Sequence, residues 1–157
     1  MRHLLMTCVF AFIAILSLAQ GSKDAKYFQI SVLTTSLPFG SMKCVSITFD
    51  SLYIKIRDCH PNSHATAYSV LTKFQQDSLL AFINTFPFKK LKDTYVNDKV
   101  DCGVLYSIQI KIDKFTKSVF VSNKYDEQLG KLIEQINKYV PKNLWIYYKK
   151  EIWDIHE

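Results

Sequence analysis

The sequence predicts a two-layer α+β domain, in which an antiparallel β-sheet carries two helices packed on one face. Two stretches, residues 44–57 and 106–122, alternate apolar and polar side chains as hairpins with one buried face do. A segment with apolar residues at helical spacing follows each hairpin, at residues 75–86 and 123–140. The chain is 48% hydrophobic and 22% charged, which is typical of one globular domain.

Residues 1–21 have the pattern of a secretory signal peptide. Arg2 and His3 precede an apolar run that ends in small and polar residues at positions 19–22. A membrane anchor is the alternative, but the run is short for a span and no cluster of positive residues follows it. We therefore expect an exported protein, periplasmic or extracellular, with residues 22–157 as a single domain and no membrane span after cleavage.

The first strand is predicted at residues 27–34, with Phe28, Ile30 and Val32 on one side. Residues 36–43 contain a proline and a glycine and are interpreted as a loop. In the hairpin at 44–57, a two-residue turn at Asp50 and Ser51 would place Ile47 opposite Ile54.

The middle of the chain gives weaker patterns. Residues 58–64 are predicted to form a loop and residues 66–74 a strand. A helix follows at residues 75–86, with four apolar residues at helical spacing (Leu79, Leu80, Ile83 and Phe86), and Pro87 ends it. Residues 88–100 are interpreted as irregular.

The hairpin at 106–122 is the clearest element. Tyr106, Ile108 and Ile110 share one face of its first strand. With a turn spanning residues 113–116, Ile110 would lie opposite Val119 and Ile108 opposite Val121. A shift by one residue would oppose apolar with polar side chains, so we expect the register to be well specified.

The last helix is predicted to begin with Asn123 as its N-cap and to stop at Pro141. Glu134 and Lys138 have the spacing of an ion pair, and Gly130 costs about 1 kcal/mol relative to alanine. Its apolar stripe comprises Leu129, Leu132, Ile133, Ile136 and Val140.

The tail after this helix carries Trp145, Tyr147, Tyr148 and Trp153. It could form an edge strand that closes the sheet, or an exposed aromatic surface for a partner. We favour the edge strand, because large exposed apolar patches are uncommon on monomers.

One cluster has metal-ligand chemistry: Asp58, Cys59, His60 and His64. These residues lie in a predicted loop, where their spacing does not make them converge as it would on a helix. We interpret them as a polar turn and expect no metal and no cofactor. No glycine-flanked nucleophilic serine or glycine-rich phosphate loop is present in the sequence, so no catalytic residue is assigned.

Three cysteines remain after signal cleavage, Cys44, Cys59 and Cys102. Export favours a disulfide, and the odd number leaves one thiol over. The predicted register places Cys44 and Cys59 on the same face as diagonal neighbours, so we favour that pair. Cys102 is the rival partner for either.

The net charge of +6 falls by one when Arg2 is removed, and the lysines are spread along the chain. A nucleic-acid site would need a basic patch, so we predict no nucleic-acid partner.

The order of elements resembles an uncharacterised family of secreted bacterial domains. Phe39–Ser41 matches part of a CFGTCP-like segment, Ser46–Thr48 resembles the hairpin after it, and Leu91–Tyr95 matches an LxDxY stretch. Pro38 and Met42 stand where the family has paired cysteines, so no redox or metal role of that pair is implied. The resemblance implies the fold and leaves the function open.

Two classes of function remain. The first is a non-catalytic exported binding module, using the sheet face, a sheet edge or the aromatic tail to hold a protein or envelope component. Tyrosine and tryptophan are enriched at interfaces, and this chain has nine and two of them. The second is a small hydrolase or metal-dependent enzyme built on the loop from Cys59 to His64. We favour the binding module.

Overall fold

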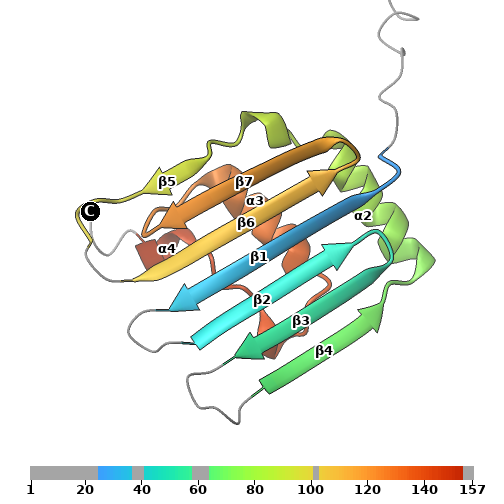
Figure 1. Cartoon of the computed structure of the whole chain (residues 1–157), viewed down its shortest axis with the longest axis horizontal. Helices are drawn as coiled ribbons and strands as arrows, with labels where there is room; N and C mark the ends of the chain where they lie inside the picture. Colours follow the sequence, from blue (N-terminus) through green and yellow to red (C-terminus); the bar gives the residue numbers. More distant parts are fainter. Residues whose placement is uncertain (1–24, 37–40, 58–63, 101–102, 154–157) are drawn as a thin grey trace, which may run out of the picture.

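The computed structural model of this chain describes residues 25–36, 41–57, 64–100 and 103–153. They form one open seven-stranded sheet in the order β4-β3-β2-β1-β6-β7-β5, with β1 in the middle (Figure 1). The strands are β1 (Phe28–Ser36), β2 (Ser41–Thr48), β3 (Ser51–Arg57), β4 (His64–Val70), β5 (Thr94–Val96), β6 (Val104–Ile112) and β7 (Phe115–Ser122). Every neighbouring pair is antiparallel except β5 and β7, which run parallel.

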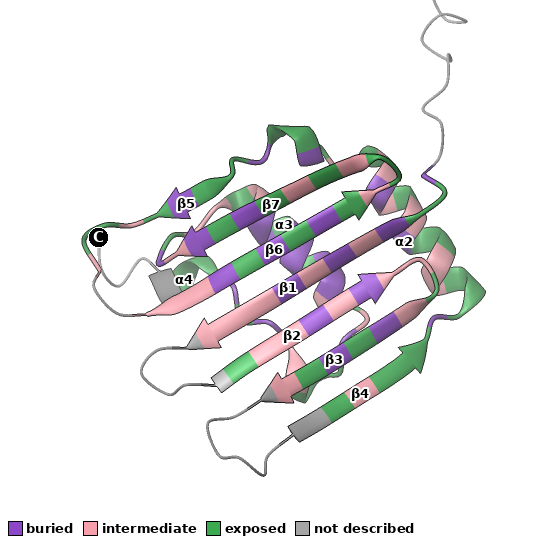
Figure 2. Cartoon of the chain, viewed as in Figure 1, coloured by how far each residue is buried: buried purple, intermediate pink, exposed green. Residues whose placement is uncertain are grey.

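The predicted fold class is confirmed: two helices, α2 (Lys73–Thr85) and α3 (Glu127–Asn137), pack on one face of this sheet. Alternation along the strands buries one face and leaves the other open, as the striped colouring in Figure 2 shows. The buried face contributes Phe28, Ile30, Val32, Val45, Ile47, Leu52, Ile54, Tyr106, Ile108, Ile110, Val119 and Val121 to the core. The predicted stripe of α3, from Leu129 to Val140, is entirely buried against it.

Both predicted hairpin registers are wrong by two residues. Ile108 pairs with Val119 rather than Val121, and Ile47 pairs with Leu52 rather than Ile54. Because the error is even, every side chain stays on its predicted face.

Local contacts at the two turns explain the shift. The carboxylate of Asp113 accepts hydrogen bonds from the backbone N–H groups of Lys26 and Tyr27, at 3.1 and 3.0 Å. These bonds hold Asp113 at a positive φ of 49°, inside a two-residue turn with Lys114. In the other hairpin, Thr48 Oγ1 accepts from the Ser51 N–H at 3.2 Å, which brings Ser51 into β3.

The strand predicted at 66–74 ends earlier, because Thr72 caps a helix. Its hydroxyl accepts from the Gln75 N–H and the Gln75 side chain accepts from the Thr72 N–H, a capping box. The helix therefore begins at Lys73, two residues before the predicted start.

Residues 88–100 are more ordered than predicted. They contain a short 3₁₀ helix, η1 (Phe88–Lys90), and the edge strand β5. Phe88, Leu91 and Tyr95 are buried in the core. Asp93 holds the segment to β7 through an ion pair with Lys117 at 2.6 Å.

Candidate functional site

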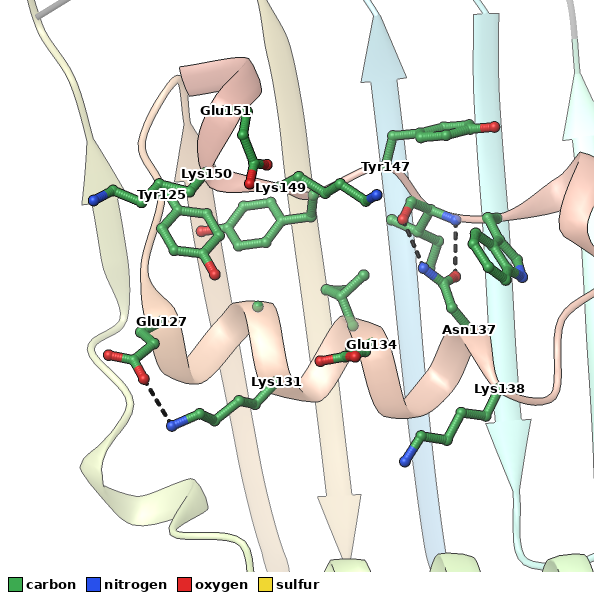
Figure 3. A pocket seen from close by; sticks show the side chains of 15 residues that line it. Tyr125, Glu127, Lys131, Glu134, Asn137, Lys138, Tyr147, Lys149, Lys150 and Glu151 are labelled. Carbon is green, nitrogen blue, oxygen red and sulfur yellow. Dashed lines mark hydrogen bonds and ion pairs between the residues drawn. The ribbon is translucent and has the colours of Figure 1, made fainter. Parts of the chain in front are cut away.

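As far as the structure describes it, up to Trp153, the tail does not form the predicted edge strand. After α3 it makes a 3₁₀ turn, η2 (Lys142–Leu144), then an irregular run at 145–149 and a single helical turn, α4 (Lys150–Trp153). The sheet already ends in β4 and β5, and α3 leaves the chain in the helical layer. The tail therefore packs beside α3 (Figure 3).

Hydrogen bonds from side chains to the backbone, rather than a strand ladder, hold the tail in place. The Asn137 amide donates to the Ile146 carbonyl at 2.8 Å and accepts from the Ile146 N–H at 2.9 Å. Lys43, which projects from β2, donates to the carbonyls of Leu144 and Trp145 at 3.1 and 3.0 Å. Burial lowers the pKa of this lysine. Backbone groups of residues 144–146 are thus satisfied by side chains on α3 and β2.

A groove of about 560 Å³ lies between α3 and the tail, and we call it the α3–tail groove. One wall consists of residues on α3 and the other of residues 145–151 (Figure 3). Its lining combines aromatic, basic and acidic side chains: Tyr125, Trp145, Tyr147 and Tyr148; Lys131, Lys138, Lys149 and Lys150; Glu127, Glu134 and Glu151.

Three tyrosines connect the groove to the sheet. The Tyr125 ring stacks on Tyr148 with centroids 5.2 Å apart, and Tyr148 meets Tyr106 of β6 edge-on at 5.2 Å. The Tyr148 hydroxyl donates to the Lys124 carbonyl and accepts from the Asp126 N–H, both at 2.9 Å. Burial raises the pKa of both Tyr106 and Tyr148. This side of the groove is therefore a rigid support.

Gly130 explains how Tyr125 reaches this position. A Cβ at Gly130 would overlap Tyr125 Oη and lie 3.0 Å from its Cζ, so a larger residue there would displace the ring from its position against α3. The pKa of the Tyr125 phenol is raised, first by burial and then by Glu127 and other nearby acids. The unfavourable glycine within a helix thus has a packing reason.

The charges along the groove are mixed. Glu127 and Lys131 form an exposed ion pair at 2.8 Å, and this contact lowers the pKa of the carboxyl and raises that of the ammonium. The sequence predicted an ion pair between Lys138 and Glu134. Lys138 instead donates a hydrogen bond to the Gln135 side chain at 2.8 Å. With lysines and glutamates interspersed, the groove has no strong field of one sign.

The predicted N-cap of α3 is also wrong. Asp126 caps the helix, accepting from the Gln128 and Leu129 N–H groups at 3.0 Å each. Asn123 instead adopts a positive φ of 52°, is buried, and donates to the Val100 carbonyl. The start of α3 is therefore set by the residue directly after Tyr125, the first aromatic residue of the groove.

Of the four aromatic interaction candidates, Trp145, Tyr147 and Tyr148 line the groove. Tyr147 is exposed, with 58% of its surface accessible, whereas Tyr148 is buried. Trp153 ends α4, and its side chain lies outside the described part of the structure. Tyr125, Gly130 and Asn137 were missed, although a glycine within a helix, five residues after a tyrosine, was a usable signal.

The metal-ligand candidates Asp58, Cys59 and His60 lie outside the described residues, as does the predicted signal peptide. His64 begins β4 without a described side chain. Within the described ranges, no group of three or more His, Cys, Asp or Glu side chains could hold a metal ion.

Cys44 carries a free, half-buried thiol whose pKa is raised by burial, with Lys55 acting in the opposite direction. In the β2–β3 ladder, Cys44 lies opposite Lys55, not opposite Arg57 as predicted. The register on which the Cys44–Cys59 bridge was predicted is therefore wrong. Cys59 and Cys102 lie outside the described residues, and no disulfide forms within those ranges.

Comparisons with known proteins add no assignment. No family model matches the chain, and no curated protein matches it. Among the helices the structure describes, none is long and apolar enough to cross a membrane.

Proposed function

We propose that the protein is an exported, non-catalytic binding module, and that the α3–tail groove receives a segment of another protein. The composition of this groove is the main support for the proposal. Exposed Tyr147 borders the groove on the side of the tail, lysine and glutamate side chains line both walls, and the Tyr125 ring stacks on Tyr148. Aromatic anchors surrounded by polar groups are typical of protein interfaces.

The internal bonding of the groove supports recognition. Asn137 and Lys43 are engaged in holding the tail backbone, and Tyr148 is fixed by two backbone groups. A surface whose walls are already ordered loses little conformational entropy when a partner binds. Tyr147 supplies an apolar ring and a hydroxyl at low entropic cost, since it has two side-chain torsions.

Site-specific photocrosslinking in the producing cell tests this function. A benzophenone amino acid replaces Tyr147 in one version and Phe120 in the other; Phe120 is also an exposed aromatic residue, but on the open sheet face. We expect position 147 to give a discrete adduct with one protein, identified by peptide mass spectrometry, and position 120 not to give it. The absence of an adduct at 147, or identical adducts from both positions, would refute the groove as the binding site.

Export is tested on the same cells. Intact mass of the recovered protein should correspond to a mature start between about residues 20 and 24, where the signal-peptide pattern ends. A soluble cytoplasmic protein that retains Met1 would contradict export without bearing on the groove.

A further inference from the structure

The outer edge of β4 has backbone groups that no strand within the described residues pairs with. Leu71 N–H donates to the Asp50 carbonyl at 2.8 Å, immediately beyond the ladder pair of Ser51 with Val70. In an antiparallel ladder hydrogen-bonded pairs alternate with non-bonded ones. The backbone groups that hydrogen-bond to β3 are therefore those of residues 65, 67, 69 and 71. The N–H and C=O groups of Thr66, Tyr68 and Val70 point away from the sheet.

This edge lacks the features that usually protect a sheet edge. Residues 65–70 include no charged residue and no proline. The opposite edge, β5, has three residues, against seven in β4 (Figure 1). Apolar side chains are exposed along and just beyond β4: Tyr68 is 65% accessible, Val70 68% and Phe74 83%. A long, neutral, exposed edge is a template for adding another strand.

The charge of the chain bears on which strand can pair with the β4 edge. The protein has a net charge of +6, so two copies repel each other overall. From Cys59 to Thr72 the chain has no lysine, arginine or acid, so β4 itself adds no like charge to a contact between two copies. An acidic peptide would gain little here, because β4 itself offers no cation to pair with it.

We propose that β4 pairs antiparallel with β4 of a second copy of this chain, so that one sheet continues through a two-fold symmetric dimer. Hydrogen-bonded pairs must join residues whose backbone groups point outward. A register centred on Tyr68 satisfies this, since Tyr68 faces Tyr68 of the second copy and Thr66 faces its Val70. These aromatic and β-branched pairs are favourable across antiparallel strands.

Analytical ultracentrifugation of the mature full-length protein tests this pairing. We expect a concentration-dependent dimer for the native sequence. Tyr68→Lys places two ammonium groups opposite each other and should weaken dimerisation at least about tenfold, the effect of about 1.4 kcal/mol. Tyr68→Pro removes an outward N–H without breaking the β3–β4 ladder and should have the same effect.

Phe120→Lys is the matched control, because it adds the same charge at an exposed aromatic position on β7, away from the β4 edge. It should leave the dimer unchanged. Circular dichroism of each variant separates loss of pairing from loss of folding, and Tyr68→Lys keeps the test decisive if the proline variant does not fold.

Hydrogen exchange supplies an independent measurement. In the dimer the amides of Thr66, Tyr68 and Val70 should be protected at high protein concentration and exchange faster on dilution, while Ser69, bonded to β3, stays protected throughout. A monomer at all concentrations, or a dimer that survives Tyr68→Lys, would overturn the proposal. So would protection of Tyr68 in a monomer, which would mean that another part of the chain covers this edge.

Discussion

Gly130 combines an unfavourable backbone choice with a packing requirement. Glycine inside a helix costs about 1 kcal/mol relative to alanine, yet a Cβ there would overlap the Tyr125 hydroxyl. The ring of Tyr125 in turn stacks on Tyr148 and forms part of the groove. The glycine is thus tied to the shape of the site.

A double-mutant cycle tests this coupling. In the Tyr125→Ala background, Gly130→Ala should stabilise the protein by up to about 1 kcal/mol, because only the helix propensity remains. In the native background the same change should give a smaller gain or a loss, because it displaces Tyr125. Urea unfolding measures both. Equal effects in the two backgrounds would show that Tyr125 does not account for the glycine.

The buried phenols predict a loss of stability at alkaline pH. Burial raises the pKa of Tyr106 and Tyr148 in the folded protein, whereas in the unfolded chain a tyrosine titrates near about pH 10. The folded state therefore holds these protons more tightly, so their contribution is complete below about pH 10 and declines as the pH rises above it.

Urea midpoints measured between about pH 8 and pH 11 should fall in the upper part of this range. Phenolate absorbance should rise together with unfolding. Tyr106→Phe is the comparison: it removes one titrating group and the hydrogen bond to the Tyr147 carbonyl, so its starting stability should be lower and its alkaline decline shallower. A decline as steep as that of the native protein would exclude Tyr106 as a contributor.

Among the elements, the hairpins show what a pattern of alternation can and cannot fix. Alternation identified the buried face of both hairpins, because a side chain's face depends only on whether its position is odd or even. It could not distinguish registers two residues apart. That choice depends on Asp113 bonding to the lead-in of β1 and on Thr48 bonding to Ser51, and the first of these contacts joins distant parts of the chain.

The tail shows a different limit. In sequence, its aromatic residues fit an edge strand as well as they fit packing against α3. Its position is set by hydrogen bonds from the Asn137 amide and from Lys43 of β2. Neither contact leaves a periodic signal. The sequence therefore indicated which residues matter in the tail, and could not indicate that they face α3.

Asn137→Ala should release one wall of the groove. It removes two hydrogen bonds to the Ile146 backbone, each worth about 0.5–1.5 kcal/mol, so we expect a loss of about 1–3 kcal/mol in the free energy of unfolding. Proteolysis within residues 145–151 should also become faster. Asn97→Ala, which removes one short-range bond to the Lys99 N–H, is the control and should change stability by less than about 0.5 kcal/mol. Equal effects of the two substitutions would contradict the role of Asn137.

At the scale of the whole molecule, the layer architecture was predictable because it depends on pooled hydrophobic pattern over long segments. The parallel strand β5 was not, because Tyr95 is the one buried residue of its three, and three residues are too few for a pattern. The groove likewise required the path of the tail. Three of its four aromatic residues were candidates on composition alone, whereas Tyr125 was recognisable only after α3 was in place.

The groove and the β4 edge lie on different parts of the fold. The groove is formed by α3 and the tail in the helical layer, and β4 is the outermost strand at one side of the sheet (Figure 1). A dimer joined through β4 would therefore carry two grooves, one on each copy, and substitutions at Tyr68 should not alter binding at Tyr147.

Calorimetric titration with the partner that crosslinks at position 147 tests the claim that the α3–tail groove is the binding surface. Tyr147→Ala should weaken affinity by at least about 30-fold, the effect of about 2 kcal/mol at a central aromatic contact. Phe120→Ala should leave affinity unchanged, since Phe120 lies on the open sheet face. Equal affinities of the native and Tyr147→Ala proteins, with both folded, would contradict the claim.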